Sequence, residues 1–385
     1  MTSFPVAGGP LHGITVVELA GLGPAPFACM MLADLGADVI RVDRPGAGEL
    51  DVPAHLELLN RGKRSVILDL KRPEGVEAVR ALATNADILV EGFRPGVAER
   101  LGLGPDELLT HNPALVYGRM TGWGQDGSAA HTAGHDISYI AVTGALHAMG
   151  DHAGRPQIPL NLVGDFGGGS TYLVLGLLAA LHEARVSGQG QVVDAAILDG
   201  TLHLLTMFHG MLAAGQWTDD RGVNTLDGGA PFYSVYETSD GRFMAVGALE
   251  RRFYQELLRV LELDDEPERQ HERAHWPALR ARLAQRFASR TQRDWTDRFA
   301  GTDACVSPVL NLREAAGHPQ IAERRAMVDV DGVVQPAVAP RFSRYPGATP
   351  GRPALPGADT RAVLRAAGLD VERLLATGVA AEDRP

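Results

Sequence analysis

The sequence predicts an α/β protein in which a parallel sheet is followed along the chain by a smaller α+β domain. The 385 residues exceed what one hydrophobic core usually covers, so two domains are expected. In the first part of the chain, apolar β-rich runs alternate with helical patterns, as in strands joined by helical crossovers. The composition, 45% hydrophobic and 22% charged, is typical of a globular chain rather than a disordered one.

The first expected strand covers residues 14–19 and ends in the turn Gly21–Pro26, after which an apolar helix covers 27–36. The later segments share a continuous apolar character, which is typical of a parallel sheet with helices on both faces. Further strands are expected at 37–43, 65–70, 87–92 and 114–122, with helices at 71–86 and 170–186 and then apolar segments at 192–200 and 201–215.

The pattern changes near Gly228. Residues 232–248 alternate around the turn Ser239–Arg242, which predicts a β-hairpin. Charged amphipathic helices are expected over 253–263 and 276–290. These elements predict a smaller α+β domain, and a short helix is expected near the end of the chain, over 358–368.

Charge and cysteine content exclude several classes of protein. The 36 Lys and Arg residues against 47 Asp and Glu residues give a formal net charge of -11, the opposite of the field that a general nucleic-acid binder needs. Two cysteines cannot build a disulfide framework, and Cys29 is expected in the core. No signal peptide is expected, the apolar stretch 171–184 is judged too short to cross a bilayer, and the ending Glu-Asp-Arg-Pro is not a peroxisomal signal. We therefore expect a soluble, cytoplasmic protein.

The turn Gly21–Pro26, with Asp43 at the end of the next strand, resembles a dinucleotide-binding fingerprint. Pro26 replaces its third glycine, and proline lacks the N–H that a phosphate would use. A tight strand-to-helix turn is therefore the favoured interpretation, and NAD binding is the alternative.

Metal and nucleophile motifs are weak. His131 and His135 have the spacing of two zinc ligands on a helix, but Gly134 lies between them and no HExxH pattern is present. Neither a GxSxG elbow nor a Cys beside a His occurs, and a Walker motif is absent.

Three segments carry the residue types of an active site, namely 121–124, 133–139 and 161–170. In the last of these, Asp165 is expected on a glycine-rich turn just before the long apolar helix. Free N–H groups and the positive end of the helix dipole at such a place suit an oxyanion, for example an enolate. The alternative is that Asp165 only caps that helix.

These segments resemble the family III CoA-transferases (the CaiB/BaiF group) and, within them, the racemases of α-methylacyl-CoA thioesters. The resemblance runs from residues 11–45 to 339–344, and its most specific motifs lie at 90–105, 119–125, 133–139, 161–170, 187–196 and 226–233. It implies a Rossmann-like large domain built from both chain ends (1–200 and 325–385), linker helices (201–227) and a small α+β domain (228–324). It also implies an interlocked homodimer with the active site at the subunit interface.

The resemblance implies an active site in which His135 and Asp165 are the two acid/base groups. Asp136 and Asn161 take supporting positions, and Glu250 orients the histidine from the partner's small domain. The residues implied for CoA binding are Arg44, Leu68, Asp69, Leu70, Lys71, Gly92, Phe93, Arg94 and Arg100, with Gly134, Ile137, Ser138 and Tyr139 at the thioester end. Residues 45–64 look unlike the family, and the basic run Arg61–Arg64 is interpreted as a solvated loop rather than a phosphate site.

Epimerising the carbon beside a thioester requires removing its proton on one face and returning one on the other, so two acid/base groups are needed. Ordinary imidazole and carboxyl groups titrate near ~6.5 and ~3.9, so the pKa of Asp165 is expected to be raised. No metal or redox cofactor is required. The alternative is CoA transfer between acids with Asp165 as nucleophile, and a non-catalytic acyl-CoA binder is a further one. The methionines of 201–215 could line an acyl pocket, but core positions are favoured.

Overall fold

The computed structural model describes residues 8–46 and 52–382 and divides the chain into two compact units. The first unit contains the residues up to Thr143, Leu160–Leu204 and the residues from Ala322 on, and the second contains Gly144–Pro159 and Leu205–Ile321. The expectations about targeting rest on the two ends of the chain, and residues 1–7 and 383–385 lie outside the described residues. Residues 47–51, part of the stretch 45–64 that looks unlike the family, also lie outside them.

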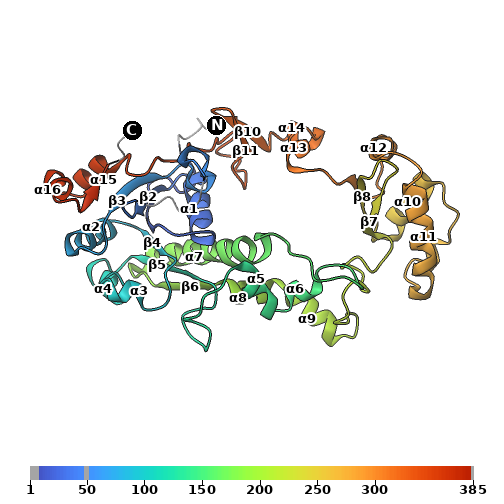
Figure 1. Cartoon of the computed structure of the whole chain (residues 1–385), viewed down its shortest axis with the longest axis horizontal. Helices are drawn as coiled ribbons and strands as arrows, with labels where there is room; N and C mark the ends of the chain where they lie inside the picture. The colour runs from blue at the N-terminus through green and yellow to red at the C-terminus, as the bar shows by residue number, and fades with distance from the viewer. Residues whose placement is uncertain (1–7, 47–51, 383–385) are drawn as a thin grey trace. The chain divides into compact units, whose positions relative to one another are not determined.

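The first unit is built on a seven-stranded sheet with the order β12-β3-β2-β1-β4-β5-β6 (Figure 1). The pairs from β3 to β6 are parallel, and β12 is antiparallel to β3. This confirms the predicted α/β class with a mostly parallel sheet, and the order of β1 to β6 is that of a doubly wound Rossmann fold. The strands are β1 (Thr15–Leu19), β2 (Asp38–Asp43), β3 (Arg64–Leu68), β4 (Ile88–Glu91), β5 (Val116–Thr121), β6 (Val192–Ala196) and β12 (Ala380–Ala381).

Helices cover both faces of this sheet, because successive side chains of a strand point to opposite faces. Val16 of β1 packs in one core with helices α1 and α7, and Val17 packs in another with α2, α15 and α16. Cys29 is fully buried in the first of these cores, as predicted. The helices of this unit are α1 (Pro24–Asp34), α2 (Pro73–Thr84), α3 (Val97–Arg100), α4 (Pro105–His111), α5 (Asp136–Val142), η3 (Leu162–Ser170), α7 (Thr171–Ser187), α8 (Ile197–Leu204), α15 (Thr360–Ala366) and α16 (Val371–Ala376).

The long apolar helix is longer than predicted, because the glycine-rich segment before it is also helical. Among the described residues, the combined helix Leu162–Ser187 is the one that is long and apolar enough to cross a membrane. The sequence-based judgement that the apolar stretch is too short is therefore wrong on length. A buried helix of a globular core meets the same criterion, and α7 packs on the sheet through Leu173, Val174 and Leu177.

The second unit contains the predicted hairpin, β7 (Tyr233–Glu237) antiparallel to β8 (Phe243–Gly247), with β9 (Val306–Pro308) as a third strand. Its core is aromatic: Trp295 packs with Phe287 and Phe299, and Phe232 packs with Tyr254. Its helices are α6 (Ala145–Ala148), α9 (Thr206–Ala213), α10 (Arg251–Leu261), α11 (Trp276–Phe287), α12 (Gln292–Phe299) and α13 (Leu312–Ala315). The chain then passes through α14 (Pro319–Glu323) to the hairpin β10 (Met327–Val330) and β11 (Val333–Pro336) of the first unit.

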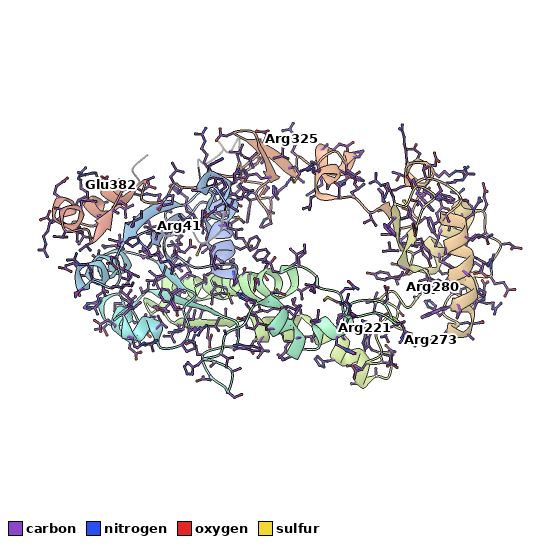
Figure 2. The ribbon with its side chains drawn as sticks, viewed as in Figure 1. Arg41, Arg221, Arg273, Arg280, Arg325 and Glu382 are labelled. Carbon is purple, nitrogen blue, oxygen red and sulfur yellow. The ribbon has the colours of Figure 1, made fainter. Side chains whose placement is uncertain are left out.

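The boundaries of the units differ from those predicted. Gly144–Pro159, expected in the large domain, belongs to the second unit, and so does the expected linker segment from Leu205 on. Arg221, which is labelled in Figure 2, gives the reason. Its guanidinium donates to the carbonyl oxygens of His147 (3.0 Å) and Asp151 (3.2 Å) and so ties the two segments together.

Candidate active site

The candidate site lies at the carboxyl ends of β1 and β4, where the strand order of the sheet reverses. Open α/β sheets bind ligands at this kind of position. The turn after β1 reaches Asp165: a Cβ atom built on Gly23 would lie 3.3 Å from the Asp165 Oδ2 atom. Gly23 has φ 71°, a left-handed conformation that favours glycine, so the turn is tight, as the favoured interpretation predicts.

Asp165 lies within the π-helical segment η3, not on a turn before the helix. The prediction of a glycine-rich turn was wrong, because these glycines allow a close helix packing instead. A Cβ atom on Gly168 would lie 2.5 Å from Thr201 Oγ1 of α8, and one on Gly200 would lie 1.8 Å from the Gly168 carbonyl oxygen. The small residues therefore let η3 and α8 approach each other at backbone distance.

The N–H groups around Asp165 are not free, in contrast to the prediction. The buried Asp136 carboxylate accepts from the Asp165 N–H at 2.7 Å and from the Gly164 N–H. The Phe166 N–H donates to the Asn161 carbonyl oxygen at 3.2 Å. An enolate oxygen would therefore need donors elsewhere.

Two further contacts hold the Asp165 side chain and backbone. Asn161 Nδ2 donates to Asp165 Oδ2 at 3.3 Å. The fully buried Ser170 hydroxyl lies 2.8 Å from the Pro24 carbonyl oxygen and 3.0 Å from the Asp165 carbonyl oxygen, so it links η3 to the first turn of α1. The sequence analysis did not identify Ser170, although it ends the quoted glycine-rich motif.

The electrostatics of the site have the expected direction. Burial raises the pKa of Asp165 above its ordinary value; the Asn161 hydrogen bond lowers it, the Asp136 charge raises it and the neighbouring His135 lowers it. Burial likewise raises the pKa of Asp136. His135, the exposed N-cap residue of α5, is thus close enough to Asp165 for their charges to interact. The structure brings His135, Asp136, Asn161 and Asp165 together in one unit.

Tyr139 is the buried neighbour of this group. Its ring packs edge-on against Trp123, with 4.8 Å between centroids. Burial raises the pKa of Tyr139, the Asp165 charge raises it further, and Arg94 lowers it. The charges of Asp165 and of the expected CoA-binding residue Arg94 both act on Tyr139. Gly134 is half-buried against Tyr139, Ser138 is half-buried, and Ile137 is exposed.

The other residues expected to bind CoA fall in two cavities and a loop. Leu70, Lys71 and Arg100 line a cavity of about 370 Å³, and Arg44 lines another of about 590 Å³ beside Gly21–Gly23. Gly92 and Arg94 are exposed in the loop after β4, with Phe93 half-buried between them. Asp69 accepts the Lys71 N–H in a turn. The Leu68 side chain is fully buried in the sheet core and lines neither cavity.

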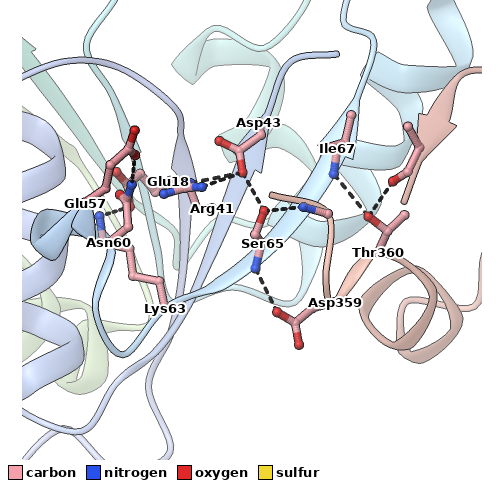
Figure 3. Close-up of polar contacts among 12 residues, drawn as sticks. Glu18, Arg41, Asp43, Glu57, Asn60, Lys63, Ser65, Ile67, Asp359 and Thr360 are labelled. Carbon is pink, nitrogen blue, oxygen red and sulfur yellow. Dashed lines mark hydrogen bonds and ion pairs between the residues drawn. The ribbon is translucent and has the colours of Figure 1, made fainter. Parts of the chain in front are cut away.

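The basic run Arg61–Arg64 is not a solvated loop, so that interpretation was wrong. Lys63 is buried, and its ammonium group lies 2.6 Å from Glu18 Oε2 (Figure 3). The same group donates to the Pro26 carbonyl oxygen at 3.0 Å. Arg61 is also buried, and it pairs with Asp34. These cations satisfy partners inside the protein and so are not a phosphate site.

Asp43, the acidic residue of the dinucleotide alternative, is occupied as well. Its Oδ2 atom accepts from the Arg41 guanidinium at 2.9 Å and from the Ser65 hydroxyl at 2.5 Å (Figure 3). Both contacts use the same carboxylate oxygen, so the Oδ2 atom of Asp43 is anchored within the protein.

Two predicted residues or segments lie in the second unit. Glu250 is exposed and is the N-cap residue of α10, where its carbonyl oxygen accepts the N–H groups of Phe253 and Tyr254. The methionine-rich segment was favoured for the core, but no residue of α9 is buried and Met207 is 54% exposed. Within residues 8–46 and 52–382, no cluster of His, Cys, Asp or Glu could hold a metal ion.

The sequence analysis missed a group of charged residues at the carboxyl ends of β4 and β5. Glu91 is buried and accepts the Phe93 N–H at 2.6 Å. Arg119 is 9% exposed and pairs with Glu99 of α3. Both residues stand within quoted family motifs, but their pairing depends on the tertiary structure.

Known proteins resemble this chain along most of its length. The model of CoA-transferase family III matches residues 11–360. The chain is 46% identical to mouse "Alpha-methylacyl-CoA racemase" over 370 residues (95% of each chain) and 45% identical to the human protein of that name over 338 residues (87% of each). It is 32% identical to "Acetyl-CoA:oxalate CoA-transferase" of Acetobacter aceti over 365 residues (90% and 93%). A CaiB/BaiF family protein from Brucella suis has the same fold, with a TM-score of 0.79, 28% identity, and 94% and 100% coverage.

Proposed function

Because the chain belongs to the family III CoA-transferases, we propose that it is an isomerase that interconverts the (2R) and (2S) forms of 2-methylacyl-CoA thioesters. The observation that carries this proposal is that an exposed imidazole, His135, lies near enough to Asp165 to act on its pKa, and that burial raises the pKa of this carboxyl group. Racemases at 45–46% identity support the same reaction class.

In the proposed reaction one of the two groups removes the α-proton while the other, protonated at the start, delivers a proton to the opposite face. A raised pKa on Asp165 serves this cycle because the carboxyl group must hold a proton in one direction. Asp136 and Asn161 keep the Asp165 carboxylate in place through the contacts described above. This proton transfer requires no metal or redox cofactor.

The intermediate is an enolate, and its oxygen needs hydrogen-bond donors. The N–H groups of Gly164, Asp165 and Phe166 are used internally. The N–H groups of Asp136 and Ile137, in the first turn of α5, have no acceptor among the described residues. We assign the enolate oxygen to this turn, next to His135.

CoA is held, in this proposal, by the cationic residues that border the site. Lys71 and Arg100 share one cavity, Arg44 lines the other, and Arg94 lies near Tyr139. Their charges suit the phosphates of CoA, and binding energy from this remote part of the substrate can fix the reacting carbon. The backbone of 68–71, the loop Gly92–Phe93 and the segment 134–139 complete the proposed site.

We further propose a cytoplasmic homodimer in which Glu250 of the partner subunit orients His135. The first unit exposes apolar side chains on adjoining elements, a surface of the kind that subunit interfaces cover. These side chains are Ile137 and Val142 of α5, Leu162 of η3, Leu175 of α7 and Leu202 of α8.

A CoA-transferase is the second candidate, because Asp165 could act as the nucleophile and a relative at 32% identity carries that name. Incubating a 2-methylacyl-CoA in heavy water separates the two reactions. Deuterium at the α-carbon with loss of stereochemical purity supports racemisation, whereas CoA passing to a free acid without α-exchange supports transfer.

The assigned residues are tested in the same assay. His135→Ala and Asp165→Ala should each lower α-exchange by about 10²-fold or more, because each removes one of the two proton-transfer groups, while CoA-ester binding survives. His131→Ala, which removes an exposed histidine from the same stretch of chain, is the matched control and should exchange like the wild type. Normal α-exchange in the His135→Ala variant or in the Asp165→Ala variant would refute the proposal.

A further inference from the structure

Arg119 is a buried arginine that contacts neither His135 nor Asp165 and lines none of the cavities described above. It lies on β5 with 9% of its surface exposed. Its Nη1 atom donates to Gln125 Oε1 at 2.8 Å, its Nη2 atom donates to Glu99 Oε1, and its Nε atom lies 3.9 Å from Glu91 Oε1. The guanidinium is therefore turned toward groups of the protein itself.

Two of these partners stand at the two ends of one short segment. Glu91 is the last residue of β4, and its Oε2 atom accepts the Phe93 N–H at 2.6 Å. Glu99 lies in α3, directly before Arg100. Within the segment, the Val97 N–H donates to the Arg94 carbonyl oxygen at 3.1 Å, so the loop and α3 are continuous.

The segment between these carboxylates carries Gly92, Phe93, Arg94 and Arg100, the residues to which the proposed function assigns much of the contact with CoA. Arg94 and Arg100 are exposed, and no ion pair holds either of them within the described residues. The backbone on which they stand therefore determines which positions their guanidinium groups can reach. Fixing both ends of that backbone reduces the conformational entropy that is lost when the phosphates bind.

We propose that Arg119 is a positioning residue for CoA binding: its hydrogen bond to Glu99 ties α3 to β5, and the pairing of β4 with β5, which sets Glu91 beside Arg119, fixes the other end, so that the segment Glu91–Arg100, clamped at both ends, holds Arg94 and Arg100 within reach of the phosphates. This inference rests on the proposed function only for the location of CoA. It requires no contact between Arg119 and the ligand. It also differs from a purely structural role, because it predicts a change in affinity at constant fold.

The test measures the affinity for CoA itself by titration calorimetry and, separately, kcat and KM for the thioester. Arg119→Met should weaken CoA binding and raise KM by about 10- to 100-fold, the value of hydrogen bonds to charged groups, and change kcat by less than about threefold. Arg119→Lys keeps the charge but cannot reach both carboxylates, so an intermediate loss is expected. Glu99→Ala releases only the α3 end and serves as a second route should Arg119→Met not fold.

Arg61→Met is the matched control, because Arg61 is another buried arginine of the same unit. It pairs with Asp34 and lies on no segment that the proposed function assigns to CoA. It should lower stability and leave the affinity for CoA unchanged. An unchanged affinity in Arg119→Met and Glu99→Ala, where Arg94→Met and Arg100→Met weaken binding, would overturn the clamp and leave the proposed function standing. No effect in Arg94→Met and Arg100→Met would overturn the CoA site and the clamp together. Weakened binding in Arg119→Met, in a protein that shows no α-exchange, would support the clamp and reject the racemase.

Discussion

Glu91 provides a quantitative prediction, because it is a buried carboxyl group whose charge is poorly compensated. Burial raises its pKa from 4.5 to about 7, the Phe93 N–H and Arg119 lower it, and the charges of Glu99 and Asp194 raise it. Glu91 is 3% exposed, so solvent screens these electrostatic interactions only weakly. The substitution Glu91→Gln removes the titration and keeps an oxygen that can accept the Phe93 N–H.

The sign follows from the two pKa values. Below pH 4.5 the carboxyl group is protonated in both the folded and the unfolded chain, so its titration does not change the free energy of unfolding. Between 4.5 and about 7 the unfolded chain releases the proton while the folded one retains it, so stability falls as pH rises; above about 7 the loss is complete. The difference between the pKa values corresponds to about 3 kcal/mol in the free energy of unfolding.

The assay measures the free energy of unfolding of the wild type and of Glu91→Gln by denaturant titration between pH 5 and pH 8. Hydrogen exchange of the amides of β4 and β5 is a second, separate measurement. The difference in stability, variant minus wild type, should rise by about 2–3 kcal/mol over this range, and other titrating groups cancel in the comparison. Glu99→Gln is the matched control: because the pKa of Glu99 is lowered below 4.5, the Glu99 carboxyl group is ionised in the folded and the unfolded chain throughout this range, so its difference in stability should stay flat between pH 5 and pH 8. A flat difference for Glu91→Gln, or one that falls with pH, would refute the reasoning.

Two further predictions concern buried groups. Lys63→Met leaves Glu18 buried without its partner and should lower the free energy of unfolding, measured by urea denaturation, by about 3–5 kcal/mol. The double variant Glu18→Gln/Lys63→Met should recover most of that loss. A double variant as unstable as the single one would contradict this prediction. Burial raises the pKa of the Cys29 thiol well above its ordinary value, so a thiol reagent should titrate Cys305 alone in the native protein and both cysteines after denaturation; rapid native reaction of both would contradict the burial of Cys29.

The sequence predicted the parallel strands well, because each is a continuous apolar run bounded by turns. β1, β2 and β4 lie within a residue or two of the expected ranges. The short elements β12 and α16 carry too little pattern to be seen, and their formation depends on partners far away in the chain. Segment 144–159 was predicted in the large domain, whereas its contacts group it with the second unit, since Arg221, which binds it, follows much later in the chain.

The candidate site shows the same division. His135, Asp136, Asn161 and Asp165 were predicted as site residues from the family resemblance, and the structure places them close together. Lys63 was missed as a buried cation because its partner, Glu18, lies on a strand distant in sequence. The helical conformation of η3 was missed because glycine lowers helix propensity, and its favourable packing on α8 is a tertiary effect.

The short strand β12 closes the open side of β3, and the region around it fastens β3 further: Asp359 accepts the Ser65 N–H and Thr360 accepts the Ile67 N–H. These residues leave the ribosome after the whole of the second unit has been synthesised. Until then, β3 is an unpaired edge strand of the nascent sheet, and such an edge can pair with strands of other chains. A fusion partner joined directly after Ala381 would hinder the pairing of β12 with β3. A spacer at this position should therefore improve the yield of folded protein.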